Sequence, residues 1–105
     1  MFIVSLTYTA SLAEIDAHLF SHLEWLKKYY DQDVFILSGR KDPPSGGIIV
    51  ATGIDRKGLE EILKEDPFVV ANITDYEIIE FTPRMTAKAL EFLKNNEQEN
   101  IHHRL

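Results

Sequence analysis

Two residues far apart in the chain, His22 and Asp66, could together do acid–base chemistry. His22 lies on a predicted helix at a position close to its apolar stripe, whereas His18 points away from that stripe. Asp66 directly precedes Pro67, where a turn needs no more than Asp, Asn or Ser. Each residue alone therefore has a structural interpretation, as a packed histidine and a turn aspartate. As a pair, the carboxylate would fix the imidazole tautomer and leave the other ring nitrogen to exchange protons.

Strands and helices alternate along the chain, and their order decides whether these two residues can meet. Apolar residues recur at every second position over 2–8, which predicts a strand, and at spacings of three and four after Ser11, which predicts a capped helix. A second helix begins at Asp55, and Pro67 ends it because the residue before a proline avoids helical backbone. The predicted elements are a strand over 2–8, a long helix over 11–30, a hairpin of strands 34–39 and 46–52, a helix from Asp55 to Pro67, a strand over 76–81 and a third helix from Pro83.

The order βαββαβ with right-handed crossovers predicts an α+β fold, the ferredoxin-like sandwich, with an extra C-terminal helix. Both main helices lie side by side on one face of its antiparallel sheet, so a residue just past the second can approach the middle of the first. This geometry permits His22 and Asp66 to form a catalytic pair in a pocket between the first helix, the end of the second helix and the sheet edge. Tyr8, Ser38 and Arg40, from strand ends, are weaker candidates for substrate contacts, and Arg40 suits an anionic group.

Composition argues against several other functions. Without cysteine, the chain cannot form disulfides, thiolate nucleophiles or cysteine zinc sites, and this fits a cytoplasmic protein. His18 and His22 are spaced as two metal ligands could be, but they lack a third ligand, so we expect neither a metal nor another cofactor. A net charge of −6 opposes the nucleic acid backbone, and the N-terminal apolar run is too short for a membrane span. We expect no nucleic acid or membrane partner.

The sequence also predicts how the chain is organised. We expect one domain over residues 1–97 and a polar tail over 98–105, with no repeat or linker between them. The predicted strands are apolar on both faces, although the chain's own helices can cover only one face. The simplest cover for the other is the same face of a second copy, which predicts a homodimer through the sheet faces.

Several segments together resemble the YCII-related (YciI-like) family across about residues 1–82: HLEWLKKYY, then LSGR, then two glycines before a strand, then EDPFVVANITDYEIIEF. The resemblance implies a ferredoxin-like fold, a dimeric α+β barrel and an active site built on the histidine and the aspartate. It also adds Gly39, beside Ser38, and Phe68, after Asp66 and Pro67, to the candidate substrate-binding residues. One relative, in chloroaromatic breakdown, is described as a dehydrochlorinase.

Two of the departures from the family pattern concern anion binding. Arg40 replaces a usual proline, and Leu19 stands where many members carry an arginine. Any contact with an anion is therefore expected from Arg40. Two function classes remain open: a small enzyme with lyase- or isomerase-like acid–base chemistry on a small organic substrate, and a noncatalytic ligand-binding or assembly module of the same fold.

Overall fold

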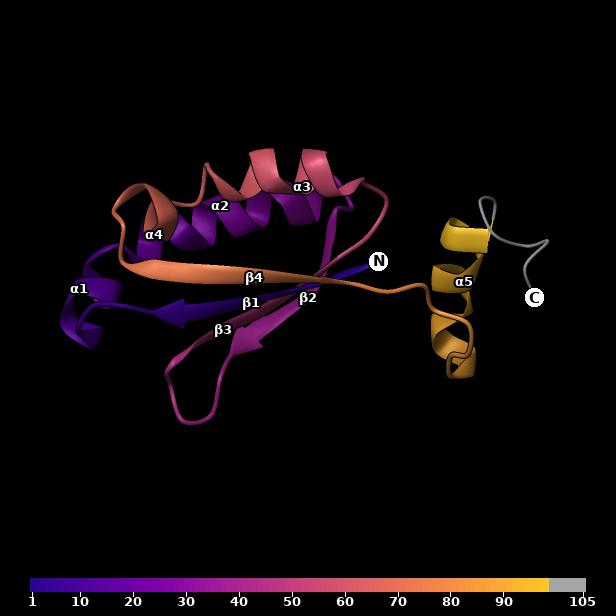
Figure 1. Cartoon of the computed structure of the whole chain (residues 1–105), viewed down its shortest axis with the longest axis horizontal. Coiled ribbons are helices and arrows are strands. Elements are labelled where there is room, and N and C mark those ends of the chain that lie inside the picture. The colour runs from indigo at the N-terminus through magenta and orange to yellow at the C-terminus, as the bar shows by residue number, and fades with distance from the viewer. Residues whose placement is uncertain (99–105) are drawn as a thin grey trace.

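Four antiparallel strands form a single sheet in the order β2-β3-β1-β4, with β1 and β3 at its centre (Figure 1). The computed structural model describes residues 1–98, and this order is that of the ferredoxin-like sandwich. The predicted α+β fold is therefore confirmed. The strands are β1 (Phe2–Tyr8), β2 (Phe35–Arg40), β3 (Gly46–Ala51) and β4 (Thr74–Glu80).

The period of two in β1 places one face of the sheet against the core. Phe2, Val4 and Leu6 are almost fully buried on that face. Val4 lies opposite Ile49 of β3 and Ile78 of β4, so the same face continues across three strands. Strands β2 and β3 pair as the predicted antiparallel hairpin.

Two long helices cover this face, and they lie side by side above the sheet (Figure 1). Trp25 ties them together by donating its indole N–H to the carbonyl of Ile62 at 3.1 Å. In the helix over 56–63, Leu59 and Leu63 are fully buried, as its apolar spacing predicts. The helices are α1 (Leu12–Ala17), α2 (Leu19–Asp31), α3 (Arg56–Leu63), α4 (Pro67–Val70), the 3₁₀ turn η1 (Lys88–Leu90) and α5 (Glu91–Gln98).

The prediction of one unbroken helix over 11–30 is wrong. Ser11 does cap the start, accepting from the backbone N–H of Glu14, but α1 ends after six residues. His18 sits between α1 and α2 with a φ of −106° and a ψ of 2°, outside the helical region. The apolar spacing continues across this break, and neither glycine nor proline occurs there. The periodicity of the sequence therefore gives no sign that the helix is interrupted.

The prediction that the third helix starts at Pro83 is also wrong. Helical structure begins at Lys88, after an irregular connection over 81–87. A proline suits the first helical position, but its fixed φ alone does not start a helix where the following residues lack an apolar face to bury. Helix α5 stands apart from the sheet (Figure 1). Most of the predicted tail, residues 99–105, lies outside the described residues, so the domain limits stay predictions.

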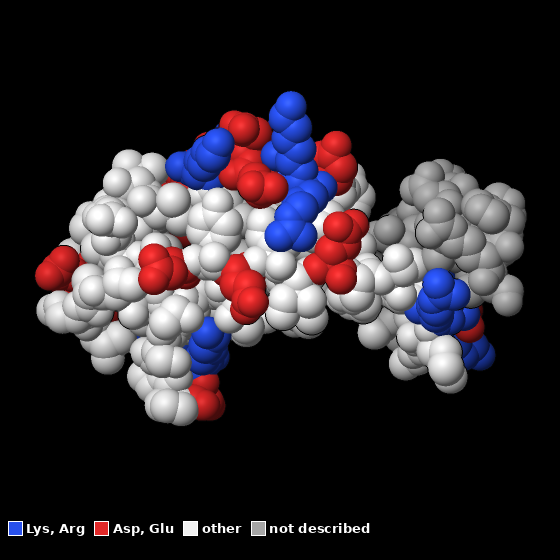
Figure 2. Space-filling model, in the orientation of Figure 1, with Lys and Arg blue, Asp and Glu red and all other residues white. Residues whose placement is uncertain are grey.

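The second face of the sheet carries apolar side chains that no helix of residues 1–98 covers (Figure 1). Leu37 is 63% exposed and Ile79 is 46% exposed there. Asp75 and Glu77 of β4 also lie exposed on this face. Acidic and basic groups are mixed over the helical layer (Figure 2). None of the described helices is both long and apolar enough to cross a membrane.

Candidate active site

Asp66 begins a helix as well as following one. Its side chain accepts a hydrogen bond from the backbone N–H of Phe68 at 3.0 Å and thereby caps α4, in which Pro67 holds the first position. We predicted Asp66 just past the second helix, and it does lie three residues beyond the end of α3 at Leu63. The short helix that it caps was not predicted, although aspartate followed by proline is a typical helix start.

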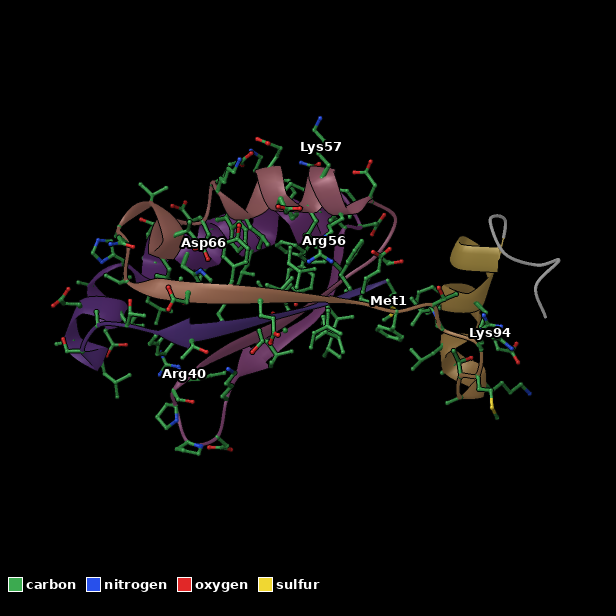
Figure 3. The ribbon with its side chains drawn as sticks, in the orientation of Figure 1. Met1, Arg40, Arg56, Lys57, Asp66 and Lys94 are labelled. Carbon is green, nitrogen blue, oxygen red and sulfur yellow. The ribbon has the colours of Figure 1, made fainter. Side chains whose placement is uncertain are left out.

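The structure brings His22 and Asp66 together. The ring Nδ1 of His22 donates to Oδ1 of Asp66 at 2.8 Å. Asp66 is fully buried and His22 is 8% exposed, so water does not compete for this bond. Figure 3 shows Asp66 within the layer between the helices and the sheet. Because a carboxylate accepts, Nδ1 carries the proton in the neutral ring, and Nε2 is the nitrogen with a free lone pair.

Aromatic neighbours hold the plane of the His22 ring. Phe68 stacks on it with a centroid distance of 4.0 Å and an interplanar angle of 6°. Trp25 packs beside it at 5.6 Å and a tilt of 35°. Asp66 therefore positions the histidine in two ways, through its own bond to Nδ1 and by capping the helix that carries Phe68.

One oxygen of the aspartate has no partner. Both side-chain hydrogen bonds of Asp66 go to Oδ1, while Oδ2 is buried and accepts no hydrogen bond from the described residues. A buried carboxylate oxygen without a donor costs free energy, and native proteins keep few such groups. A residue needed only to turn the chain would not require a buried carboxylate oxygen without a partner.

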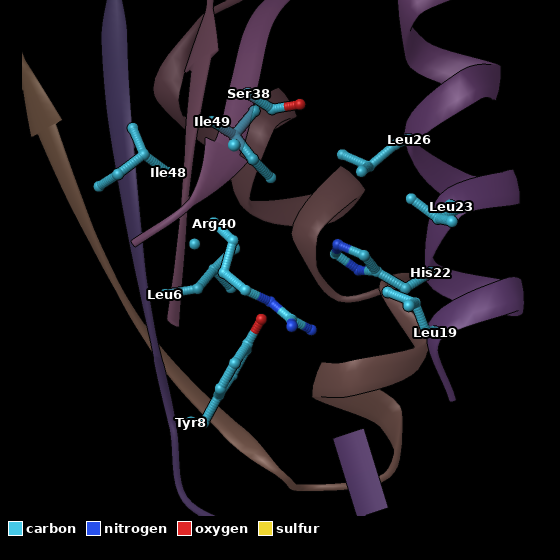
Figure 4. A pocket seen from close by; sticks show the side chains of 12 residues that line it. Leu6, Tyr8, Leu19, His22, Leu23, Leu26, Ser38, Arg40, Ile48 and Ile49 are labelled. Atoms are coloured by element: carbon cyan, nitrogen blue, oxygen red, sulfur yellow. The ribbon is translucent and has the colours of Figure 1, made fainter. Parts of the chain in front are cut away.

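His22 also forms part of the wall of a cavity of about 280 Å³ between α2 and the sheet (Figure 4). The ring projects from α2 toward the strands, and no hydrogen bond to Nε2 is found within residues 1–98. Asp66 contacts Nδ1 of the ring and does not line the cavity. The wall consists of Leu6, Tyr8, Leu19, His22, Leu23, Leu26, Ser38, Gly39, Arg40, Gly47, Ile48 and Ile49.

Four of the candidate substrate-binding residues line this cavity, namely Tyr8, Ser38, Gly39 and Arg40. Ser38 shares a hydrogen bond of 2.6 Å with the hydroxyl of Tyr30, which fixes its side chain. The fifth candidate, Phe68, stacks on the ring of His22 and is not part of the wall.

Arg40 is held from two sides. Its guanidinium carbon is 5.9 Å from the ring centre of Tyr8, and its Nη2 is 3.6 Å from Oδ1 of Asp16. The neighbouring Tyr8 side chain is the main cause that raises the pKa of Arg40, with a smaller contribution from Asp16. Arg40 therefore remains a cation on the cavity wall.

Sequence reasoning missed the apolar part of this wall. Leu19, Leu23 and Leu26 follow one another at helical spacing on the same side of α2 as His22, and that signal was read only as core. Gly47 lies opposite Arg40 in the β2–β3 register. The pattern of α2 alone does not show which strand residues lie opposite one another, so it could not place Gly47 on the cavity wall.

The second histidine of the helix takes no part in the site. Nδ1 of His18 lies 3.0 Å from the backbone carbonyl of Glu14, one turn earlier. No cluster of three or more potential metal ligands occurs in the part of the chain that the structure describes.

Comparison with known proteins gives a family and a structural neighbour. The model of the YCII-related domain matches residues 1–82. No curated protein matches the chain. Among solved structures, the chain is similar to 5-chloro-2-hydroxyhydroquinone dehydrochlorinase from Burkholderia phenoliruptrix AC1100, in complex with 2,5-dihydroxybenzoquinone. The match has a TM-score of 0.64 and 14% sequence identity, and it covers 77% of this chain and 93% of the neighbour. At that identity the likeness concerns the fold.

Proposed function

This chain belongs to the YCII-related family, and from its site we propose that it is a small cytoplasmic enzyme in which His22 and Asp66 act as an acid–base pair on a small organic substrate. The observation that carries the proposal is the buried 2.8 Å bond between Nδ1 and Oδ1 at the wall of a cavity. A histidine oriented by a carboxylate, with its second nitrogen at a cavity, is the arrangement that general acid–base catalysis requires.

In the proposed reaction, Nε2 of His22 takes a proton from a C–H or O–H group of the substrate. Asp66 stabilises the imidazolium that forms and keeps its own negative charge. When a C–H bond breaks, its electron pair forms a double bond in the substrate. Either a leaving group on the adjacent carbon departs with its bonding pair, or the proton returns to another atom. The first outcome is a lyase reaction and the second is an isomerisation.

The structural neighbour supports this choice of chemistry. Its name describes a dehydrochlorinase, an enzyme that removes hydrogen and chloride from a small ring compound. The cavity here is near the lower end of the ~300–1,000 Å³ typical of ligand pockets, which suits a substrate of that size.

The test is an assay of chloride release from 5-chloro-2-hydroxyhydroquinone, with solvent deuterium incorporation followed in parallel by mass spectrometry. The proposal predicts turnover by the wild type that falls about 10²–10⁴-fold in His22→Gln. His18→Gln is the matched control, because His18 lies four residues earlier in the chain, does not line the cavity and has its ring hydrogen-bonded to a backbone carbonyl. Equal turnover in the wild type and His22→Gln would contradict the acid–base role. Saturable binding without turnover would favour the noncatalytic ligand-binding module.

We also propose that the enzyme works as a homodimer through the open sheet face. The support is the set of apolar side chains on that face, where Leu37 and Ile79 are exposed and Ile3 is only partly buried. Sedimentation at micromolar concentration should give twice the monomer mass. Leu37→Asp should produce monomers, whereas Val70→Asp, an equally exposed site on α4, should not. A wild-type monomer would contradict the proposal.

A further inference from the structure

The cavity wall is chemically asymmetric. Arg40 is the one residue with a full permanent charge among the described residues that line it, and none of these residues is acidic. The chain as a whole carries a net charge of −6. A cationic cavity in an acidic protein is complementary to a negatively charged ligand and unfavourable for a cationic one.

Arg40 keeps donors available for such a ligand. A guanidinium has five N–H donors, and Asp16 approaches one nitrogen at 3.6 Å, beyond ordinary hydrogen-bond length. The side chains of Arg40 and Asp16 are 41% and 61% exposed, so solvent screens this pair and the aspartate does little to neutralise the arginine. The contact with Asp16 orients Arg40, and so does the contact with the ring of Tyr8.

Two polar groups, the guanidinium of Arg40 and the hydroxyl of Tyr8, converge on the same space (Figure 4). Figure 4 shows the hydroxyl of Tyr8 beside the guanidinium of Arg40, and both face the side of the cavity from which His22 projects. The remaining wall is predominantly aliphatic. It is formed by Leu6, Leu19, Leu23, Leu26, Ile48 and Ile49.

We infer that this cavity selects a compact organic monoanion, with a carboxylate or comparably acidic oxygen held by Arg40 and Tyr8 and an apolar body packed on the leucines. Held in this way, the body lies between the anchor and His22. The inference depends on the proposed function for the choice of cavity, but anion selection is a property of binding and can be measured without turnover. Arg40 then determines specificity.

The experiment uses two probes of the same shape that differ in charge, benzoate and benzamide. Each is titrated into ¹⁵N-labelled protein while the amide resonances of the cavity residues are followed by NMR. Benzoate should bind at least about tenfold more tightly than benzamide, since a charge-assisted bond to Arg40 contributes about that factor. Arg40→Gln should remove the preference, and Arg40→Lys should retain part of it.

Lys41→Gln is the matched control. It removes the same charge from the next residue of the chain, but Lys41 contacts Thr7 at 3.4 Å and does not line the cavity, so the preference for benzoate should persist. Equal binding of the two probes, a preference that survives Arg40→Gln, or no saturable shift with either probe would each overturn the inference. The wild type and His22→Gln together separate the two proposals. Anion selection by a wild type that shows no turnover supports the anchor alone. Wild-type turnover that falls in His22→Gln, without anion selection in either protein, supports the acid–base pair alone.

Discussion

Two consecutive carboxylates, Glu65 and Asp66, each accept a hydrogen bond from an aromatic side chain of α2, yet they differ in their exposure to water. Tyr29 donates to Glu65 at 2.6 Å, and His22 donates to Asp66 at 2.8 Å. The Glu65 side chain is 47% exposed, whereas Asp66 is fully buried. Both bonds connect α2 to the segment between α3 and α4, so bond length does not distinguish them and solvent exposure does.

This difference indicates two different roles. Lys28 also approaches Glu65 at 3.3 Å, and exposed pairs of that kind contribute about 0–1 kcal/mol. Burial of Asp66 with one oxygen unpartnered is unfavourable in free energy, and a turn alone does not require it. The exposed bond connects α2 to the segment after α3, whereas the buried bond keeps a carboxylate beside a histidine at the cavity.

Replacing the two carboxylates by alanine should give the largest contrast. Asp66→Ala should lower the free energy of unfolding by about 2–4 kcal/mol, because it removes the cap of α4 and leaves Nδ1 of His22 buried without an acceptor. Glu65→Ala should lower it by about 1 kcal/mol or less. Urea denaturation measures both values. Equal losses would show that burial does not separate the two carboxylates.

A milder change at the same position should separate fold from catalysis. Asp66→Asn keeps an oxygen that can accept from Phe68, but its amide can present either oxygen or nitrogen to the ring of His22. The single imidazole tautomer should therefore become a mixture, and turnover should fall by about 10²–10⁴-fold. Ring ¹⁵N chemical shifts measure the tautomer, and chloride release measures turnover.

Glu65→Gln is the control for that experiment, and it should leave both the His22 ring shifts and the turnover unchanged. If Asp66→Asn behaves in the same way, Asp66 is a capping residue and its approach to His22 has no catalytic consequence.

The contrast also shows what the sequence could predict. The strand order and the inward direction of His22 follow from periodicity, since alternation and helical spacing are local properties of the chain. The approach of His22 to Asp66 follows from the fold, because the ferredoxin-like topology sets α2 beside α3. The stacking of Phe68 on His22 depends on the short helix α4, whose start at Asp66 and Pro67 could have been recognised.

The other features depend on contacts that no local pattern encodes. The break at His18 carries no helix-breaking residue, and the apolar spacing continues through it. Asp16 meets Arg40, and Tyr30 meets Ser38, only because side chains of α1 and α2 approach those of β2 in the folded chain. Distances and rotamers decide such contacts, and residue type alone does not.

The exposed bond itself should have a modest, measurable effect. Tyr29→Phe removes the hydroxyl that donates to Glu65 but keeps the ring that packs against Trp25 and Phe35. The free energy of unfolding should fall by about 1 kcal/mol. A double-mutant cycle with Glu65→Gln should assign most of that loss to the pair. A coupling energy near zero would mean that Tyr29 stabilises the fold through its ring alone.

The smallest expected effect is the pH dependence of that loss. The hydrogen bond from Tyr29 lowers the pKa of Glu65, so its stabilisation is complete above the ordinary pKa of glutamate and disappears as the pH falls through the lowered value. Burial, together with the bond to Glu65, raises the pKa of Tyr29, so that contribution is complete below the ordinary pKa of tyrosine and is lost as the pH rises through the raised value. The difference in unfolding free energy between the wild type and Tyr29→Phe should therefore be constant from about pH 5 to 9 and shrink on either side. Urea denaturation at pH 3, 7 and 10 measures this difference. A difference as large at pH 3 as at pH 7 would show that the ionised carboxylate of Glu65 is not what Tyr29 stabilises, and the two neighbouring bonds would then differ in more than their exposure to water.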